Sequence, residues 1–281
     1  GLGNQLFQYA TAKSLALRLG VNLVLDLNWY LDNSDSNRKF ILDKLNIDDS
    51  TCTFGVKLPR LIRLILYKIY EVLSTLGLGL PVLKDIDFEY NNNVLNIQEP
   101  VFLNGYWQNE TYFKSYKNVL SQIFQLKSDI DQRNSELLEK IKNSNSICIH
   151  IRRGDYITDP NTAAINGTCS KNYYYQALNI LLENIDFPVC YVFSDDPQWA
   201  KANLGFDCES VFVDINPVHQ AELDFILMKS CKYFIIANST FSWWAAWLSQ
   251  YKNKQVIAPN VWFVDQVLNN NMKLPYSWIR I

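Results

Sequence analysis

The chain has 281 residues, of which 48% are apolar, and a net charge of −2. Its length predicts about two domains of ~100–200 residues each. Because the overall charge is close to zero, the composition excludes a protein that binds nucleic acid through a global basic field, and any anionic ligand must be held by a local cluster. The six cysteines form no CxxC pair and there are only two histidines, so we expect no metal and no cofactor. Cysteines within strand-like apolar runs favour a reducing, cytoplasmic location.

The first twenty residues, GLGNQLFQYATAKSLALRLG, predict a glycine-rich loop followed by an amphipathic helix. A loop of this kind usually follows a strand, so we expect a short strand ahead of Gly1. Gly3 lies in the flexible part of this loop, and the amides of Asn4 and Gln5 can reach a ligand across a cleft. The next apolar run, residues 21–30, predicts a strand that ends near Asp26.

Residues 58–80 show helical periodicity, with Arg60, Arg63 and Lys68 on one side and apolar residues on the other. A basic amphipathic helix can lie on an anionic membrane, here the cytoplasmic face of the inner membrane. The pattern also fits a helix that packs on the core and leaves its polar face in solvent. The sequence has no run of ~20 apolar residues, the length needed to span a bilayer.

Residues 99–108 predict a strand that runs into an aromatic loop with Trp107 and Gln108. Residues 115–143 predict one or two surface helices, rich in Lys, Asn and Ser toward their end, which mark a domain boundary. We therefore expect an N-terminal domain over residues 1–143 and a C-terminal domain over residues 144–281.

Short apolar runs alternate with helical stretches throughout the second half, beginning with SICIHI (146–151) and KNYYYQALNILLENI (171–185). The runs are apolar on both faces, which is typical of parallel strands covered by helices on both sides. This pattern predicts a Rossmann-like unit, and a looser alternation predicts a second α/β unit in the first half. Ligands of such sheets bind beyond the carboxyl ends of the strands.

The first of these strands ends in the charged string HIRRGDY. Side chains alternate along a strand, so His150 and Arg152 should share one side, with Arg153 on the other. One guanidinium group can bind two phosphate oxygens at once, so we expect Arg152 to bind a phosphate beside His150. Arg153 is then expected to pair with Asp155 and hold the turn. A purely structural ion pair at the strand end is the alternative.

The second strand ends in FSDD, which provides Ser194, Asp195 and Asp196. Adjacent side chains diverge, so a pair of carboxylates acting together on a glycosidic bond is not expected. We expect one acid to accept hydrogen bonds from a guanine and the other to face solvent or to cap the next helix.

A later strand ends in ANSTFS and leads directly into a helix. Free N–H groups and the positive end of the helix dipole favour an anion at such a start. A plain N-cap by Ser239 or Ser242 explains the same residues. Combined with two arginines at the same sheet edge, the string predicts a diphosphate site.

The strings GLGNQLFQYA, GYWQNE, HIRRGDY, FSDDPQW and IIANSTFSWWAAWL together resemble the bacterial α-1,2-fucosyltransferases of glycosyltransferase family eleven. Their order and spacing follow the family, and the similarity runs over essentially the whole chain. The Arg-Arg turn and the NSTFSWW string are its most specific parts. The chain departs from the family ahead of Gly1, where the family has a strand and a further glycine.

The resemblance implies a GT-B architecture, in which two Rossmann-like domains with parallel sheets face a central cleft. The C-terminal domain would hold GDP-β-L-fucose without a metal, and the N-terminal domain would face the acceptor. The implied partners are GDP-fucose and a glycan ending in a β-galactoside, with no nucleic acid.

Carried over by position, the resemblance implies catalytic roles for Arg152, His150 and Asn4. Apart from the resemblance, we expect Trp107 and Gln108 in the aromatic loop, and Asp26, to contact the acceptor. The donor would be held by a larger set, namely Gly3, Gln5, Arg153, Asp155, Ser194, Asp195, Asp196, Asn238, Ser239, Thr240, Phe241 and Ser242.

The implied reaction is transfer of L-fucose, with inversion, to the 2-hydroxyl of a terminal β-galactoside on an oligosaccharide or a lipid-linked glycan. Asp26, Glu110 and Asp155 are the candidates for the base. Two alternatives stay open: a GDP-fucose-dependent transferase of α-1,6 type, and a non-catalytic protein that binds a sugar nucleotide or a glycan.

Overall fold

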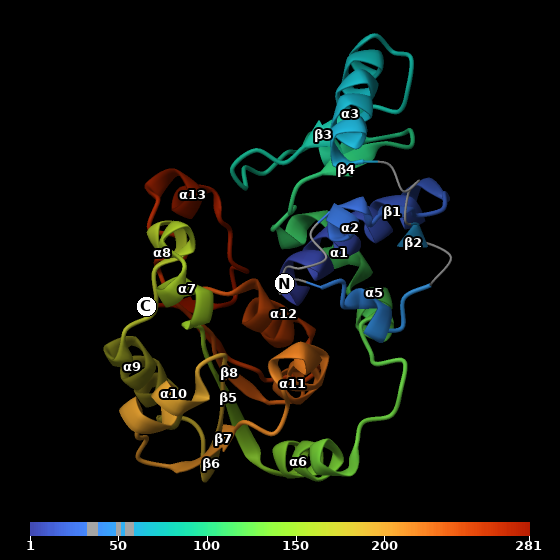
Figure 1. Ribbon diagram of the computed structural model, residues 1–281. Helices are drawn as coiled ribbons and strands as arrows, with labels where there is room; N and C mark the ends of the chain where they lie inside the picture. The colour runs from blue at the N-terminus through green and yellow to red at the C-terminus, as the bar shows by residue number, and fades with distance from the viewer. Residues whose placement is uncertain (33–38, 49–51, 54–58) are drawn as a thin grey trace. The chain divides into compact units, whose positions relative to one another are not determined.

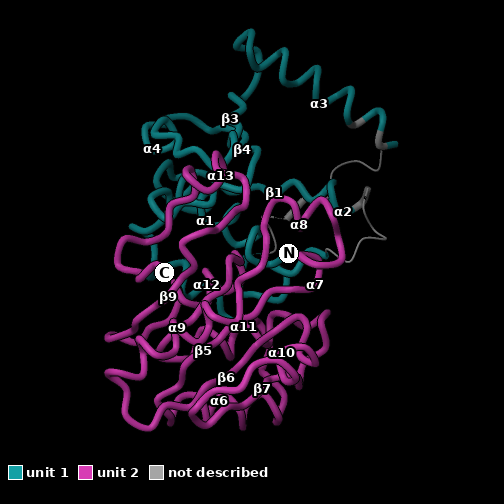
Figure 2. Tube along the Cα trace, turned by 90° about the vertical axis from the view of Figure 1, so that its left-hand side faces the viewer, with its two compact units in different colours: residues 1–125 teal, residues 126–281 magenta. Residues whose placement is uncertain are grey.

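The structure is a computed structural model that describes residues 1–32, 39–48, 52–53 and 59–281. The chain forms two compact units, Gly1–Gln125 and Leu126–Ile281 (Figures 1 and 2). The division therefore falls earlier than the expected junction at 143/144. The reason is that helix α6 (Gln132–Asn143) is part of the second unit. Its Asn134 exchanges hydrogen bonds of 2.8 and 2.9 Å with Asn216.

The second unit is built on one six-stranded sheet in which every strand pair is parallel. Its strands are β5 (Asn145–Ile151), β6 (Pro188–Ser194), β7 (Glu209–Val213), β8 (Tyr233–Ile235), β9 (Val256–Ala258) and β10 (Ile279–Arg280). The spatial order is β10-β9-β8-β5-β6-β7. If the strands are numbered 1 to 6 from β5 to β10 and the sheet is read from its β7 edge, the order is 3-2-1-4-5-6, which is that of a Rossmann fold. The Rossmann-like prediction is confirmed for this unit.

The helices of the second unit follow its strands in chain order. They are α7 (Gly154–Thr158), α8 (Pro160–Asn166), α9 (Lys171–Leu182), α10 (Pro197–Asn203), η5 (Val218–Gln220), α11 (Ala221–Lys229), α12 (Thr240–Leu248) and α13 (Gln266–Asn271), in addition to α6. Helices α9 and α10 lie on one side of the sheet and α6 and α11 on the other (Figure 1).

Side-chain alternation along β5 divides its residues between the two faces of the sheet. Ile147, Ile149 and Ile151 belong to a fully buried core with α9 and α10. His150 points to the opposite face, where its ring lies 5.8 Å from that of Phe241. Both faces are covered, which is why the strand reads as an almost uninterrupted apolar run.

Helix α12 is buried all round. Trp243, Trp244 and Trp247 are each at most 4% exposed. Trp243 stacks on Trp247 at 5.9 Å and meets Trp278 at 5.5 Å, close to the end of the chain. Because this helix cannot turn without displacing large aromatic side chains, its N-terminus is held rigidly at the end of β8.

The first unit has two separate two-stranded parallel sheets, β1-β2 and β3-β4, among its described residues. Its elements are α1 (Leu2–Leu19), β1 (Leu25–Asp26), α2 (Asn28–Asp32), η1 (Leu42–Lys44), β2 (Cys52–Thr53), α3 (Arg60–Thr75), β3 (Val82–Lys84), α4 (Asn93–Asn96), β4 (Phe102–Asn104), η3 (Glu110–Tyr112), η4 (Lys114–Tyr116) and α5 (Lys117–Ile123). Parallel α/β structure is thus confirmed in both units, and a complete Rossmann-like sheet in the first unit stays a prediction.

The glycine-rich start of the chain is helical and not a loop. Helix α1 begins at Leu2, with Gly1 as its N-cap, so that residues 3–5 lie in the first turns. The helix ends at Gly20, which adopts the left-handed conformation at φ 67°. The expectation of a flexible loop at Gly3 is therefore wrong, because the helical hydrogen bonding already begins there.

The turn after β4 depends on a glycine. Gly105 has φ 152°, and a Cβ there would lie 2.1 Å from Cβ of Asp85. This close approach lets the Asp85 carboxylate accept the backbone N–H groups of Tyr106 and Trp107, at 3.1 and 2.9 Å. Burial raises the pKa of Asp85, and these two hydrogen bonds oppose the rise.

Gly105→Ala is expected to destabilise the first unit by about 2–4 kcal/mol, through steric overlap with Asp85 and a strained φ. Chemical denaturation followed by tryptophan fluorescence measures this change. Gly79→Ala is the matched control, because a Cβ there meets only Tyr70, at an ordinary 3.4 Å. Equal stability of the two variants would contradict the proposed role of Gly105.

Candidate active site

Polar residues collect where the strand order of the second unit reverses, between β5 and β8. Ligands of doubly wound sheets bind at this point, beyond the carboxyl ends of the two strands. Here β5 runs into residues 152–155 and β8 into residues 236–240. The hydroxyl of Tyr156 joins the two strand ends by donating to the carbonyl oxygen of Asn238 at 3.0 Å.

Arg152 lies just past the end of β5, with about one third of its side chain exposed. Its guanidinium group pairs with Asp155 at 2.7 Å and with Asp195 at 3.1 Å. The ring of Tyr156 lies 5.4 Å from the guanidinium carbon. These contacts fix the guanidinium group in one orientation, and its exposed part remains available to an anionic ligand.

Arg153 does not pair with Asp155, contrary to the prediction. Its guanidinium group stacks on the ring of Trp199 at 3.7 Å and lies 3.6 Å from a carboxylate oxygen of Asp196. The prediction extended strand alternation one residue too far. The strand ends at Ile151, and the backbone turns into α7, which brings Asp155 round to Arg152.

The Asp195 carboxylate ties the turn after β5 to the end of β6. One oxygen accepts the backbone N–H of Arg153 at 2.8 Å, and the other pairs with Arg152. Gly154 makes this possible, since a Cβ there would lie 2.6 Å from Asp195 Oδ2. Asp195 therefore positions Arg152. Contact of either FSDD acid with a guanine stays a prediction.

Asp196 and Ser194 close the turn after β6. Asp196 is the N-cap of α10 and accepts the backbone N–H of Trp199 at 3.1 Å. The Ser194 hydroxyl accepts the backbone N–H of Asp196 at 3.0 Å. The helix-capping alternative is thus the one found for Asp196.

His150 is only 4% exposed, and its Nδ1 has no hydrogen-bond partner among the described residues. Burial lowers the pKa of His150 to about 3, and the nearby charge of Arg152 contributes to the same shift. The imidazole is therefore neutral at physiological pH. It can donate or accept a hydrogen bond but cannot supply positive charge to a phosphate.

The N-terminus of α12 lies beside this group. Ser239 is the N-cap and accepts the backbone N–H of Phe241 at 3.4 Å. Thr240 is the first helical residue. The nine-residue helix places the positive end of its dipole at the reversal point, where an anion is stabilised.

Two residues expected to bind the donor have structural roles instead. The Asn238 amide donates to the carbonyl oxygens of Asn166, Gly167 and Trp262, at 2.8, 3.3 and 3.1 Å. Ser242 is fully buried, and its hydroxyl is within hydrogen-bond distance of backbone carbonyls one turn earlier. Both side chains hold loops in place, because buried polar groups must be satisfied inside the fold.

Gln5 also has a structural role. Its amide nitrogen donates to the carbonyl oxygen of Lys39 at 2.7 Å, and its amide oxygen accepts the backbone N–H of Ile41 at 2.9 Å. Asn4 instead meets Gln108, whose amide donates to Asn4 Oδ1 at 3.2 Å. Gln108 Oε1 is buried and has no partner among the described residues. The first unit therefore brings Asn4 and Gln108 together.

Trp107 cannot stack on an acceptor sugar in this structure. It is 1% exposed and packs edge to face on Tyr112 at 5.8 Å. A sequence does not distinguish an aromatic side chain on the surface from one in the core, and Trp107 lies in the core. Asp26 is exposed at the end of β1, where it accepts two hydrogen bonds from Asn28, at 2.9 and 2.6 Å.

Sequence reasoning missed two acids at the start of α11. Glu222 is 9% exposed, and its Oε2 is buried without a partner among the described residues. Burial raises the pKa of Asp224 to about 6, and Glu222 adds to the rise, while a hydrogen bond from Asn216 opposes it. The signal was present in the sequence: two acids open an otherwise apolar helix. The ring of Phe225, the residue after Asp224, lies 5.8 Å from that of Phe241.

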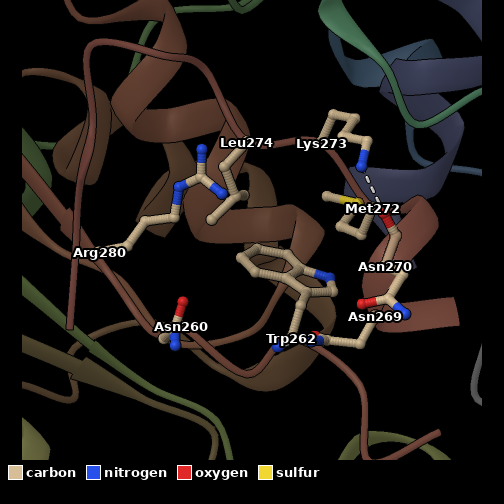
Figure 3. Close-up of a pocket in the computed structure, with 8 residues that line it drawn as sticks. All are labelled: Asn260, Trp262, Asn269, Asn270, Met272, Lys273, Leu274 and Arg280. Atoms are coloured by element: carbon tan, nitrogen blue, oxygen red, sulfur yellow. Dashed lines mark hydrogen bonds between the residues drawn. The ribbon is translucent and has the colours of Figure 1, made fainter. Parts of the chain in front are cut away.

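A pocket of about 220 Å³ lies beyond the carboxyl ends of β9 and β10 (Figure 3). Asn260, Lys273 and Arg280 supply its polar wall, and Trp262 and Leu274 its apolar part. Lys273 donates to the carbonyl oxygen of Asn270 at 2.5 Å. The pocket belongs to the same sheet edge as Arg152, though to the other side of the reversal point.

The sequence profile of glycosyl transferase family 11 matches residues 86–281 of the chain. The chain belongs to this family and is a glycosyltransferase.

Its relatives include two proteins of Escherichia coli that align with its whole length. An alpha-1,2-colitosyltransferase is 36% identical, with 96% of its own length covered. The O-antigen biosynthesis glycosyltransferase WbnK is 35% identical, with 98% of its own length covered. The galactoside 2-alpha-L-fucosyltransferase SEC1 of Bos taurus is 26% identical over 54% of this chain and 43% of its own length.

The burial of His150 makes a testable prediction about its charge. Since its folded pKa of about 3 lies below the ordinary 6.5, the folded state binds this proton less readily than the unfolded state. The resulting contribution to stability is complete above about pH 6.5 and is lost as the pH falls toward about 3. In a ¹H–¹³C spectrum, the His150 ring signals should not shift between about pH 5 and pH 8.

His219→Gln assigns the two histidine signals, because His219 is the only other histidine and is exposed. A His150 signal that titrates near the ordinary pKa would show that its ring is solvated, contrary to this structure.

Proposed function

We propose that the chain transfers L-fucose from GDP-β-L-fucose to the 2-hydroxyl of a terminal β-galactoside, on an oligosaccharide or a lipid-linked glycan. The observation that carries this proposal is the partly exposed Arg152 beside the α12 N-terminus, at the reversal point of a Rossmann sheet. The names of the relatives, which include α-1,2-transferases for colitose and for fucose, support the linkage. We further propose a GT-B arrangement, with the donor on the second unit.

The charges around Arg152 indicate how a diphosphate would enter. Two guanidinium groups, of Arg152 and Arg153, accompany the three carboxylates of Asp155, Asp195 and Asp196. A phosphate must therefore replace a carboxylate at Arg152. Asp195 also accepts the Arg153 backbone N–H, so its displacement would open the turn after β5. The positive end of the α12 helix dipole then adds a second source of positive potential.

The proposed reaction is a single displacement. The acceptor 2-oxygen bonds to C1 of fucose on the face opposite GDP, while the bond from C1 to the β-phosphate oxygen breaks. The electron pair of that bond leaves with GDP, and Arg152 stabilises the negative charge that develops there. The acceptor hydroxyl proton passes to a base. Asp155 in the second unit and Asp26 and Glu110 in the first stay the candidates for it.

A second donor, GDP-colitose, is favoured by the full-length similarity to an alpha-1,2-colitosyltransferase. Colitose is L-fucose without its 3-hydroxyl, so the two donors differ by one hydrogen-bonding group. A site that binds this hydroxyl would discriminate strongly against the deoxy sugar, whereas an apolar contact would discriminate weakly.

The test is GDP release from GDP-fucose and GDP-colitose, each with and without a panel of β-galactosides, followed by linkage analysis of the product. We expect 2-O-fucosylated galactose and turnover that withstands EDTA. Transfer to another position would contradict the proposed linkage. A preference for GDP-colitose would contradict GDP-fucose as the donor. Binding of GDP-fucose with no turnover on any acceptor would favour the non-catalytic alternative.

The two adjacent arginines are expected to respond differently to mutation. Arg152→Ala should lower kcat by about 10²–10³ in a folded protein, the usual cost of removing one donor to a developing oxyanion. Arg153→Ala should reduce stability by about 1–2 kcal/mol, since it loses the stack on Trp199 and the contact with Asp196. Steady-state kinetics and chemical denaturation of both variants measure these changes.

The reverse pattern, a stable but inactive Arg153→Ala and an active Arg152→Ala, would exchange the roles assigned to the two residues. Circular dichroism of each variant confirms that it is folded before the kinetic comparison is made.

A further inference from the structure

Helix α3 packs on its own unit through aromatic and polar side chains. The rings of Tyr67 and Tyr70 lie 6.2 and 6.4 Å from that of Phe102. The Tyr67 hydroxyl accepts a hydrogen bond from Asn104 at 2.6 Å, and Glu71 forms an ion pair with Lys84, also at 2.6 Å. The side of α3 that faces the β3-β4 sheet is therefore its less apolar side.

The opposite side of α3 is apolar and uncovered. Its residues follow helical spacing, so that they form one continuous stripe, here called the outer face. The outer face consists of Leu61, Ile62, Ile65, Leu66, Ile69, Val72, Leu73 and Leu76. Each of these side chains is between 37% and 68% exposed. The alternative that this helix buries its apolar side in the core is thus wrong for the residues described.

Beyond the helix, Leu78 and Leu80 are also exposed, at 69% and 49%. Soluble proteins seldom leave so many large apolar side chains in one uncovered patch, and such patches mark interaction surfaces. An amphipathic helix in the ordinary position would turn this stripe inward. Because the apolar side of α3 faces away from its own unit, it is available to bind a partner outside that unit.

The charge of the segment indicates what that is. Residues 59–80 contain three basic residues, Arg60, Arg63 and Lys68, and one acid, Glu71. The charge of Glu71 is balanced by Lys84, which leaves the segment basic. Lys68 is exposed, at the border of the outer face. An apolar stripe with an exposed lysine at its border, in a segment of net positive charge, is complementary to an anionic lipid surface, whose headgroups attract the cation while the acyl chains accept the apolar side chains.

The length of α3 decides how it would lie. Its 16 residues extend about 24 Å, short of the ~30 Å hydrocarbon core of a bilayer. In the described part of the chain, no helix is long and apolar enough to cross a membrane. A helix of this length and pattern lies in the plane of the interface, with its apolar stripe at the boundary between headgroups and acyl chains.

We propose that α3 docks the protein on an anionic lipid bilayer, with the outer face inserted and Lys68 at the headgroups. This inference goes beyond the proposed transferase activity and does not rest on it. Docking would hold the enzyme at the surface where a lipid-linked acceptor is presented, whichever sugar it transfers.

Vesicle sedimentation tests the proposal. The full chain is mixed with vesicles of phosphatidylcholine alone, or of phosphatidylcholine and phosphatidylglycerol in equal parts. We expect sedimentation with the anionic vesicles at about 0.1 M salt and a large loss of binding at about 1 M salt, where screening removes the electrostatic attraction. Protein that stays in the supernatant with anionic vesicles overturns the proposal.

Variants of α3 separate the two contributions. Ile65→Glu with Ile69→Glu places two charges at the centre of the outer face and should lower partitioning at least about tenfold. Lys68→Glu should lower it by roughly an order of magnitude, through the reversed charge. The matched control is Val24→Glu with Val119→Glu, two exposed positions of the same unit off α3, which should bind as the wild type does.

Two controls keep the outcomes distinct. Circular dichroism and transfer to a soluble acceptor should be unchanged in the α3 variants, since α3 carries no residue of the candidate site. Light scattering detects the competing occupant, a second copy of the chain. A wild-type dimer that becomes monomeric in Ile65→Glu with Ile69→Glu, without vesicle binding, would assign the outer face to self-association and overturn the lipid proposal.

Discussion

The reversal of strand order between β5 and β8 is the constraint on which the candidate site depends. Both strands are parallel and end at the same edge, so the residues that follow them meet although they are far apart in the chain. Tyr156 fastens the two ends together through the Asn238 carbonyl, and Asp195 fastens the turn after β5 to the end of β6. Because Gly154 has no side chain, this carboxylate can approach closely enough to hold Arg152.

Most polar residues in the distinctive motifs hold the neighbouring backbone in place. Asn238, Ser242 and Gln5 use their side chains to hold neighbouring backbone, and Asp196 caps a helix. Burying an amide or hydroxyl without a hydrogen-bond partner costs free energy. Each of these side chains therefore hydrogen-bonds to nearby backbone and fixes its position. Within the second unit, Asn238, Ser242 and Asp196 thereby hold the backbone at the strand ends near Arg152, and the role proposed for Arg152 requires such preorganisation.

The sequence predicted the second unit well and the first unit less well, for a physical reason. Strands buried on both faces, as β5 is, give an unambiguous apolar run, and their order in the chain follows the α/β alternation. In the first unit, the described strands have two or three residues each, too few for a period to emerge. The helical start at Leu2 and the burial of Trp107 were missed because a glycine-rich string fits a loop or a helix start, and a tryptophan fits the surface or the core.

The sequence by itself determined the family, the parallel α/β class and the collection of charged residues at strand ends, because these follow from local patterns and from motif order. Only the tertiary structure decided which acid meets which arginine. Alternation predicts directions along a strand, but β5 ends at Ile151, and beyond it the turn brings Asp155 to Arg152 and leaves Arg153 to Trp199 and Asp196. The same holds for α3: its amphipathic pattern is evident in the sequence, but which side faces the protein depended on Tyr67, Tyr70 and their contact with Phe102.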